Sequence, residues 1–331
     1  MKRVLVVDDS LLMTKVISDI INSIPDFKVC AVAKSGEEAI DKFIEHKPDI
    51  VTLDFELPDH NGLWVLKHIL EDRWVPVIMV SAHTRDGAEV TLECLEQGAV
   101  DFIAKPSGTI SLDLKRDMFI DKLNHATYAN PVRHDIVVPK LKAKPGFNCV
   151  GIGSSTGGVK ALLSVLPALP ADFPGSIMVV QHMPKEFTRT FAQRLNNTSK
   201  LKVIEAQGYE DIRKGMVFIA PGGQHMTIKG NRVQITNDPP IWGVRPAADR
   251  LFPAIAQKFG TSAIGVVITG MGRDGANGIK EIKEQGGKTI AEDPNTAFIK
   301  SMPQNAIKTG CVDFIVPLAK IAQKIVELVS A

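Results

Sequence analysis

The chain has 331 residues, of which 44% are hydrophobic, so it is long enough for two ordinary domains, each with its own core. Its formal net charge of +2 gives no overall attraction to nucleic acid or to a membrane surface. Its four cysteines are far apart and form no C-x-x-C pair, which favours reduced thiols over disulfides or a zinc site. We find no apolar run typical of a signal peptide or a membrane span. We therefore expect a cytoplasmic protein with no nucleic acid partner and no direct membrane insertion.

Short apolar runs alternate with amphipathic stretches in residues 1–123. Five such repeats predict a doubly wound α/β domain with a flavodoxin-like parallel sheet, whose ligands bind outside the carboxyl ends of the strands. The predicted strands are Val4–Val7, Val29–Val32, Ile50–Leu53, Val77–Val80 and Asp101–Ala104, and the predicted helices are Met13–Ile24, Glu37–Glu45, Leu63–Leu70, Ala88–Gln97 and Leu112–Leu123.

Polar side chains follow four of these predicted strands. Asp8 and Asp9 follow the first strand and Asp54 the third, while Ser81 and Lys105 follow the fourth and fifth. Three carboxylates at one edge repel one another, and a divalent cation such as Mg²⁺ would compensate their charge. The serine hydroxyl and the ammonium could then bind the oxygens of a phosphoryl group. Taken singly, each residue is more often a turn or capping residue, but their joint occurrence favours a site.

This constellation resembles the receiver domain of response regulators. The motifs that carry the resemblance are Val7-Asp8-Asp9-Ser10, Leu53-Asp54-Phe55-Glu56-Leu57-Pro58, Val80-Ser81-Ala82 and Asp101-Phe102-Ile103-Ala104-Lys105-Pro106. The resemblance implies that Asp54 accepts a phosphoryl group from the phosphohistidine of a kinase.

The same resemblance implies a Mg²⁺ site and a switch. Asp9, Asp54 and the Glu56 carbonyl would hold the ion, and Asp8 would act on it through water. Phe102 would be the aromatic residue that moves inward when Ser81 is drawn to the phosphoryl group, although an aromatic residue in a strand is more often plain core.

The periodicity fails in residues 124–146, where prolines punctuate a basic stretch. Proline fixes φ and removes an N–H donor, so this stretch is predicted to be a linker. A basic run could instead bind an acidic partner, but its charges are few and no aromatic residues interleave with them.

Strands and helices alternate again in residues 147–331, which predicts a second, larger α/β domain with a mostly parallel sheet. An antiparallel hairpin is predicted over 226–235, because period-two alternation flanks Gly230-Asn231. The other predicted strands are Phe147–Ile152, Ser176–Gln181, Lys202–Glu205, Ala263–Thr269, Lys288–Ala291 and Val312–Val316, and the predicted helices are Val159–Leu166, Thr188–Leu195, Ala247–Phe259, Gly278–Gln285 and Leu318–Val329.

The turn after the first strand of this domain has the form G-x-S-x-G, in Gly153-Ser-Ser155-Thr-Gly157. A glycine-flanked turn of this kind presents a serine hydroxyl and backbone N–H groups at the top of a sheet. Such turns also cradle phosphates, and Gly151-x-Gly153 begins like a dinucleotide-binding loop. That alternative is weaker, because Thr156 stands in place of its third glycine.

A base and an acid follow two other strands of the second domain. His182 and Asp274 would lie with Ser155 at one sheet edge, where a serine, its base and an orienting anion can assemble. The alternatives are a structural histidine and an ordinary turn aspartate. His225 competes for the role of base but precedes the hairpin, so we rank it as a pocket-lining or structural residue.

Together these residues resemble the catalytic domain of the chemotaxis protein-glutamate methylesterase (CheB) family. The motifs are Gly153-Ser-Ser155-Thr-Gly-Gly158, Gln181-His182-Met-Pro-Lys-Glu-Phe-Thr-Arg189, Ala220-Pro-Gly-Gly223, Arg245-Pro-Ala-Ala-Asp249 and Thr269-Gly-Met-Gly-Arg-Asp274-Gly. The resemblance implies hydrolysis of glutamyl methyl esters on chemoreceptors, often with deamidation of receptor glutamines. Its partners would be a chemotaxis histidine kinase and the cytoplasmic domains of membrane chemoreceptors.

We expect Ser155 to attack the ester while His182 takes its proton and Asp274 orients the imidazole, with no cofactor for this step. The oxyanion would bind the backbone N–H groups of Thr156 and Met271. Phosphorylation would relieve an occlusion of the site by the receiver. The alternative is a phospho-switched binding module without catalysis; the near-neutral charge and the lack of a recognition helix disfavour DNA as its partner.

Overall fold

The computed structural model describes residues 1–81, 85–105, 111–129, 137–139 and 146–330. The chain forms two units, Met1–Pro131 and Val132–Ala331, and each is described here by itself. Ala82 and Pro106 of the receiver motifs, and most of the predicted linker, lie outside the described residues. Within the described part of the chain, no helix has both the length and the apolar character needed to cross a membrane.

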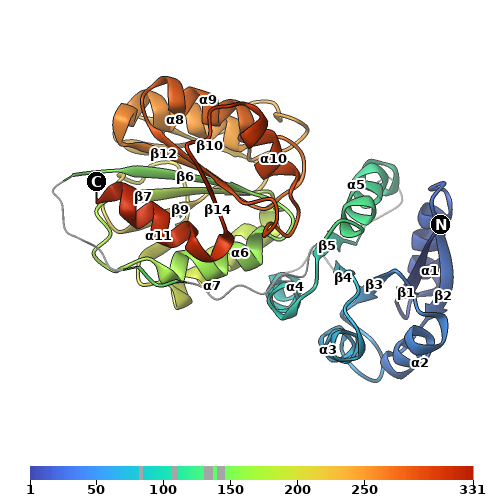
Figure 1. The fold of residues 1–331 in the computed structure, drawn as a ribbon. Helices are drawn as coiled ribbons and strands as arrows, with labels where there is room; N and C mark the ends of the chain where they lie inside the picture. The colour runs from blue at the N-terminus through green and yellow to red at the C-terminus, as the bar shows by residue number, and fades with distance from the viewer. Residues whose placement is uncertain (82–84, 106–110, 130–136, 140–145, 331) are drawn as a thin grey trace. The chain divides into compact units, whose positions relative to one another are not determined.

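The N-terminal unit is a parallel five-stranded sheet in the order β2-β1-β3-β4-β5 (Figure 1). Helix α1 contacts α5, whereas α3 contacts α2 and α4, so the two groups of helices cover different faces. This confirms the predicted doubly wound fold. The strands are β1 (Lys2–Val7), β2 (Phe27–Ala33), β3 (Ile50–Asp54), β4 (Val77–Ser81) and β5 (Asp101–Ala104), and the helices are α1 (Leu11–Asn22), α2 (Gly36–His46), α3 (Gly62–Asp72), α4 (Arg85–Gln97) and α5 (Ser111–Ala126).

Burial and capping explain these elements. Every residue of β3 and β4 is buried, as expected for strands that helices cover on both faces. Helices α1, α2 and α3 begin after Ser10, Ser35 and Asn61, whose side chains each accept a backbone N–H of the first turn.

The C-terminal unit is a parallel seven-stranded sheet in the order β14-β13-β12-β6-β7-β9-β8, with an antiparallel hairpin of β10 and β11. Helices α6, α7 and α11 lie on one side of this sheet and α8, α9 and α10 on the other (Figure 1). The strands are β6 (Cys149–Ser154), β7 (Ser176–Gln181), β8 (Lys202–Glu205), β9 (Met216–Ile219), β10 (His225–Lys229), β11 (Arg232–Thr236), β12 (Ala263–Val267), β13 (Lys288–Glu292) and β14 (Phe314–Val316). The helices are α6 (Gly158–Ala168), α7 (Lys185–Thr198), α8 (Ala248–Phe259), α9 (Ala276–Glu284), α10 (Ser301–Lys308) and α11 (Leu318–Val329), with a short 3-10 turn at Gly260–Ser262.

Two elements of this unit were not predicted. Strand β9 is a short run of apolar residues only, so it shows no alternation that identifies a strand. Helix α10 has eight residues and carries Pro303 in its first turn, where a missing N–H costs no helical hydrogen bond. Strand β9 pairs with β7, which precedes His182, and α10 contacts β12, which precedes Asp274.

Glycines in β6 let α8 pack directly on the central strand. A Cβ on Gly151 would lie 2.8 Å from the Phe252 ring, and one on Gly153 would lie 2.8 Å from Ala248 Cβ. Both distances are shorter than a carbon–carbon contact, so any larger residue would push α8 away. The glycines therefore fix the N-terminus of α8 next to the end of β6.

Candidate active site and phosphorylation site

Three carboxylates meet where β1 and β3 end. Asp8 and Asp9 follow β1, and Asp54 is the last residue of β3. One oxygen of each carboxylate lies within 4.8 Å of the other two. Asp8 and Asp54 are buried and Asp9 is exposed, so the cluster opens to solvent on one side.

The Lys105 ammonium lies against this cluster. Its Nζ is 2.5 Å from Asp54 Oδ2 and 3.1 Å from Asp8 Oδ2. Burial nevertheless raises the pKa of Asp54 to about 6, with a further increase from the Asp8 charge, because the hydrogen bond and charge of Lys105 offset only part of the desolvation. One ammonium therefore does not compensate these buried carboxylates.

A divalent cation fits this set of donors. Mg²⁺ prefers carboxylate oxygens and keeps several of its waters, so an open acidic cluster suits it. Asp8 Oδ2 is buried and, apart from its ion pair with Lys105, has no partner among the described residues. The side chain of Glu56 is exposed and is not part of the cluster, and its carbonyl oxygen stays a predicted ligand.

The two predicted switch residues lie on β4 and β5. Ser81 is buried, and its hydroxyl donates to the Gly87 carbonyl at 3.2 Å. Phe102 is already buried, with Lys122 Nζ 4.9 Å from its ring centre. The Ser81 hydroxyl would have to leave its carbonyl partner to reach a phosphoryl group on Asp54.

The adjacent serines after β6 differ in what they contact. Ser154 is fully buried, and its hydroxyl donates to Gln181 Oε1 at 2.6 Å. Ser155 is partly exposed, and Gln181 Nε2 donates to its carbonyl at 2.9 Å. Gly157 adopts a φ of +79°, which a residue with a Cβ rarely adopts, and directly precedes α6. The turn thus leaves Ser155 accessible at the sheet edge and buries Ser154 in the domain interior.

Topology brings the three predicted catalytic residues to one edge. Strand β6 lies between β7 and β12, so Ser155 stands between the strands that precede His182 and Asp274. The chain after β7 stays tied to the turn, because the His182 N–H donates to the Ser154 carbonyl at 3.1 Å.

The imidazole of His182 contacts the carboxylate of Asp274. His182 Nε2 lies 2.7 Å from Asp274 Oδ2. The same carboxylate accepts the N–H groups of Ala248 at 2.6 Å and Asp249 at 2.9 Å, at the start of α8. A helix N-terminus stabilises a carboxylate charge. The start of α8 therefore fixes the position of Asp274 and stabilises its negative charge, which an imidazolium requires.

Ser155 and His182 are close in the fold but are not hydrogen-bonded in the described part of the chain. Asp274 contacts Nε2, so Nδ1 is the ring nitrogen without a hydrogen-bond partner among the described residues. Catalytic hydrogen bonds often tighten only when substrate binds, so this geometry suits a resting site.

The predicted oxyanion donors lie on two neighbouring loops. Thr156 follows Ser155, and Met271 lies in the loop after β12. The residues beside Met271 are clamped: the Gly270 N–H donates to Ile299 O at 3.0 Å, and the Gly272 N–H donates to Ser301 Oγ at 3.0 Å. Among the described residues the Met271 N–H has no hydrogen-bond partner, as an oxyanion donor requires.

Several supporting residues have no predicted role. Gln181 holds both serines of the turn, and Thr269 accepts the Ser155 N–H at 3.1 Å. Asn305 Nδ2 donates to the Gly272 carbonyl at 2.8 Å from α10. Gln181 and Thr269 stand inside quoted motifs, and a polar residue at a buried strand end was the signal that could have found them. Nothing local in the sequence marks Asn305.

His225 is fully buried, and within the described part of the chain no hydrogen bond joins it to the candidate triad. Its Nε2 lies 3.1 Å from Pro239 O, and its Nδ1 accepts the Ala247 N–H at 3.2 Å. Burial lowers the pKa of His225. Both ring nitrogens of His225 are engaged, and Nδ1 fixes the residue that precedes α8, so a pocket-lining or structural role stays the prediction.

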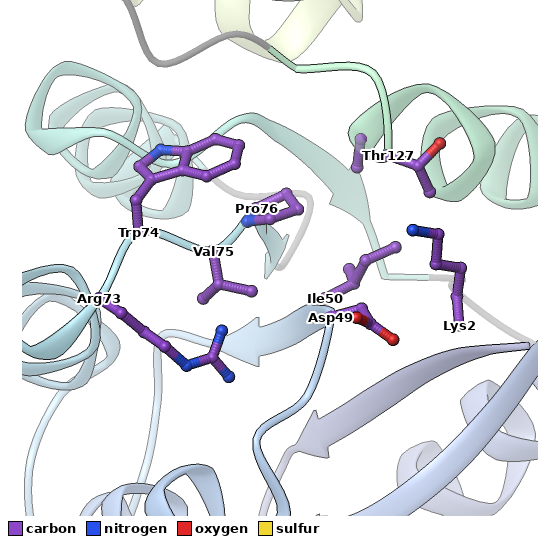
Figure 2. A pocket seen from close by; sticks show the side chains of 9 residues that line it. Lys2, Asp49, Ile50, Arg73, Trp74, Val75, Pro76 and Thr127 are labelled. Atoms are coloured by element: carbon purple, nitrogen blue, oxygen red, sulfur yellow. The ribbon is translucent and has the colours of Figure 1, made fainter.

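A separate hollow of about 260 Å³ lies in the N-terminal unit (Figure 2). Lys2, Asp49, Arg73 and Trp74 line it, at the amino ends of β1 and β3. The acidic cluster follows the carboxyl ends of the same strands, where parallel sheets bind ligands. The hollow therefore does not belong to the candidate phosphorylation site.

The first unit is a parallel α/β domain with an acidic cluster and a lysine. The second is an α/β domain with a serine, a histidine and an aspartate at one sheet edge. Together they define a response regulator with a hydrolase-type output domain. Comparisons with known proteins agree. Residues 150–325 match the model of the CheB methylesterase family, and residues 4–115 match that of the response regulator receiver domain. The chain belongs to the CheB methylesterase family.

Relatives match along nearly the whole chain. It is 46% identical to the protein-glutamate methylesterase/protein-glutamine glutaminase of Pyrococcus abyssi, over 99% of this chain and 93% of that protein. It is 43% identical to the protein of the same name from Thermotoga maritima, over 99% of this chain and 98% of that protein. The crystal structure of the Thermotoga maritima CheB methylesterase catalytic domain covers 55% of this chain and 99% of its own, with 41% identity and a TM-score of 0.54.

Proposed function

We propose that this protein hydrolyses glutamate methyl esters on chemoreceptors, releases methanol, and deamidates selected receptor glutamines. The observation that carries the proposal is the 2.7 Å contact of His182 with Asp274 beside the Ser155 turn. The names of the relatives support both reactions.

The site supports acyl transfer through a covalent intermediate. Ser155 Oγ attacks the ester carbonyl, and its proton passes to Nδ1 of His182 while Asp274 stabilises the imidazolium. The oxyanion binds the N–H groups of Thr156 and Met271. The bond to the methoxy group then breaks, and His182 returns its proton to form methanol. Water, activated by the same imidazole, hydrolyses the acyl-serine; with a glutamine substrate the leaving group is ammonia.

The N-terminal unit supplies the control input of the proposal. Asp54 accepts a phosphoryl group from the phosphohistidine of a chemotaxis kinase, and Lys105 binds a phosphoryl oxygen. Mg²⁺ held by Asp9, Asp54 and the Glu56 carbonyl, with Asp8 acting through water, would neutralise the incoming phosphoryl charge. The order of the two units in the chain motivates the proposed regulation. The unphosphorylated receiver limits access of the receptor to the catalytic site, and phosphorylation relieves that limit. The four unpaired cysteines support a cytoplasmic setting.

Methanol release from methylated receptor tests the catalytic proposal. Ser155→Ala should lower the rate by about 10³-fold or more, and a fluorophosphonate probe should label Ser155 in the unchanged protein. Ser164→Ala, on the side of α6, is the matched control. Near-normal methanol release by Ser155→Ala would overturn the proposal and favour a binding module.

Control by the receiver is tested separately. The catalytic domain of a relative has been crystallised alone, so a fragment that begins at Gly146 should fold. This fragment should release methanol faster than the unphosphorylated full chain. A folded fragment with unchanged or lower activity would contradict occlusion while leaving the esterase proposal intact.

A further inference from the structure

A buried carboxyl group that the mechanism does not use lies beneath the nucleophile turn. Glu292 ends β13 and is fully buried. Its Oε2 accepts the Thr269 N–H at 2.7 Å, and its Oε1 accepts the Thr296 hydroxyl at 3.4 Å. Burial raises the pKa of Glu292 to about 8, and no cation pairs with it in the described part of the chain. A buried carboxyl group lowers the free energy of unfolding relative to an apolar side chain at the same position. We therefore expect this carboxyl group to have a role.

Thr269 connects this carboxyl to the nucleophile. The Thr269 carbonyl accepts the Ser155 N–H at 3.1 Å, and the Thr269 hydroxyl donates to the Thr156 carbonyl at 3.0 Å. These two bonds lie on either side of the peptide unit that joins Ser155 to Thr156. That unit carries the proposed oxyanion N–H, so its orientation depends on Thr269.

Thr269 also fixes the second oxyanion loop. Its hydroxyl accepts the Ile299 N–H at 2.8 Å, and the Ile299 carbonyl accepts the Gly270 N–H at 3.0 Å. Met271 follows directly. One residue therefore holds both loops, and the Glu292 carboxyl is the side chain that fixes its backbone.

We propose that Glu292 is a positioning residue for the esterase reaction, which acts through Thr269 to hold Ser155 and both oxyanion N–H groups in register. The inference rests on the proposed role of Ser155. The required property is an acceptor oxygen at the Oε2 position. Glu292→Gln keeps such an oxygen, whereas Glu292→Leu removes it at similar volume.

Kinetics of the full chain on methylated receptor test the proposal. Glu292→Gln should keep kcat within about 3-fold, and Glu292→Leu should lower kcat by about 10- to 100-fold with KM little changed, because a misaligned oxyanion site weakens transition-state binding alone. The rate at which a fluorophosphonate probe labels Ser155 should fall with kcat. Equal kcat for the Leu and Gln variants, at equal thermal stability, would overturn the inference.

Threonine variants keep the proposal testable if Glu292→Leu does not fold. Thr269→Val should lower kcat about 10-fold or more and Thr269→Ser should restore it, since serine keeps the hydroxyl. Thr289→Val is the control: this buried threonine of β13 bonds to Cys311 O and Asp313, away from the turn, and should affect stability rather than kcat. Equal losses of kcat in Thr269→Val and Thr289→Val would contradict the role.

Failure of this inference is distinguishable from failure of the catalytic proposal. If Ser155 is labelled in the unchanged protein but labelling is as fast in Glu292→Leu, only the positioning role is wrong. If Ser155 is not labelled in the unchanged protein, the catalytic assignment itself fails.

Discussion

His182 Nε2 lies 2.7 Å from Asp274 Oδ2, and Asp274 is in turn fixed by two N–H groups at the start of α8. The aspartate therefore caps the N-terminus of α8 and also belongs to the candidate triad. Replacement by an amide would leave one acceptor oxygen and place an NH2 group either against the Asp249 N–H or against the Ala248 N–H and the imidazole.

Asp274→Asn should lower kcat for methanol release by about 10³- to 10⁴-fold, because the imidazole loses the anion that holds its tautomer. Steady-state kinetics on methylated receptor measure the effect. Asp211→Asn removes a carboxylate paired with surface arginines and should keep normal kinetics. Similar rates for the two variants would remove Asp274 from the mechanism.

Gly158→Ala should distort the turn that contains Ser154 and Ser155. A Cβ there would lie 2.1 Å from Gln181 Oε1 and 2.8 Å from Ser154 Cβ, so Gln181 must move and release the turn. We expect kcat to fall about 10-fold or more, with a lower unfolding temperature. Gly146→Ala is the control, since its nearest neighbour would be 4.0 Å away. Normal kinetics for Gly158→Ala would show that the turn tolerates the shift.

Mg²⁺ should raise the thermal unfolding temperature of the receiver domain, because it binds the folded carboxylate cluster and not the unfolded chain. Asp9 is exposed, so Asp9→Asn should fold normally and lose most of the Mg²⁺-dependent shift. Asp19→Asn, on the exposed side of α1, should keep it. The same shift in both variants would place the ion elsewhere.

Glu292 should make the stability of the catalytic domain depend on pH. Its pKa is raised from 4.5 to about 8, so its contribution is full below pH 4.5 and is lost as pH rises through 8. Between pH 5 and 8 the free energy of unfolding should fall by about 3 kcal/mol relative to Glu292→Gln, which cannot ionise. Urea unfolding at each pH measures the difference. Exposed Glu281→Gln is the control, and parallel curves for Glu292→Gln and the unchanged protein would contradict the shift.

The sequence predicted the fold class because both sheets consist of parallel strands whose apolar runs alternate with amphipathic helices. It also placed Ser155, His182 and Asp274 after strands that share one edge, since parallel strands end on the same side. Ser154 is buried and Ser155 is partly exposed, and the G-x-S-x-G frame had also selected Ser155 rather than Ser154.

The supporting contacts could not be predicted in the same way. Thr269 and Glu292 meet across neighbouring strands, and their pairing depends on the register of β12 and β13. The nitrogen of His182 that faces Asp274 depends on a side-chain rotamer and on where α8 begins. The clamp on the Met271 loop comes from α10, whose short, proline-containing sequence gives a weak helical signal.

The orientation of the His182 ring has a consequence for chemical probes. With Nε2 held by Asp274, Nδ1 is the ring nitrogen that would act as the base in the proposed mechanism. An electrophilic glutamate analogue bound at the site should alkylate Nδ1, and the deshielded ring proton in an NMR spectrum should be the one on Nε2. Nδ1 is the ring nitrogen closer to the histidine backbone, so the proposed base would act close to the main chain rather than at the tip of the side chain.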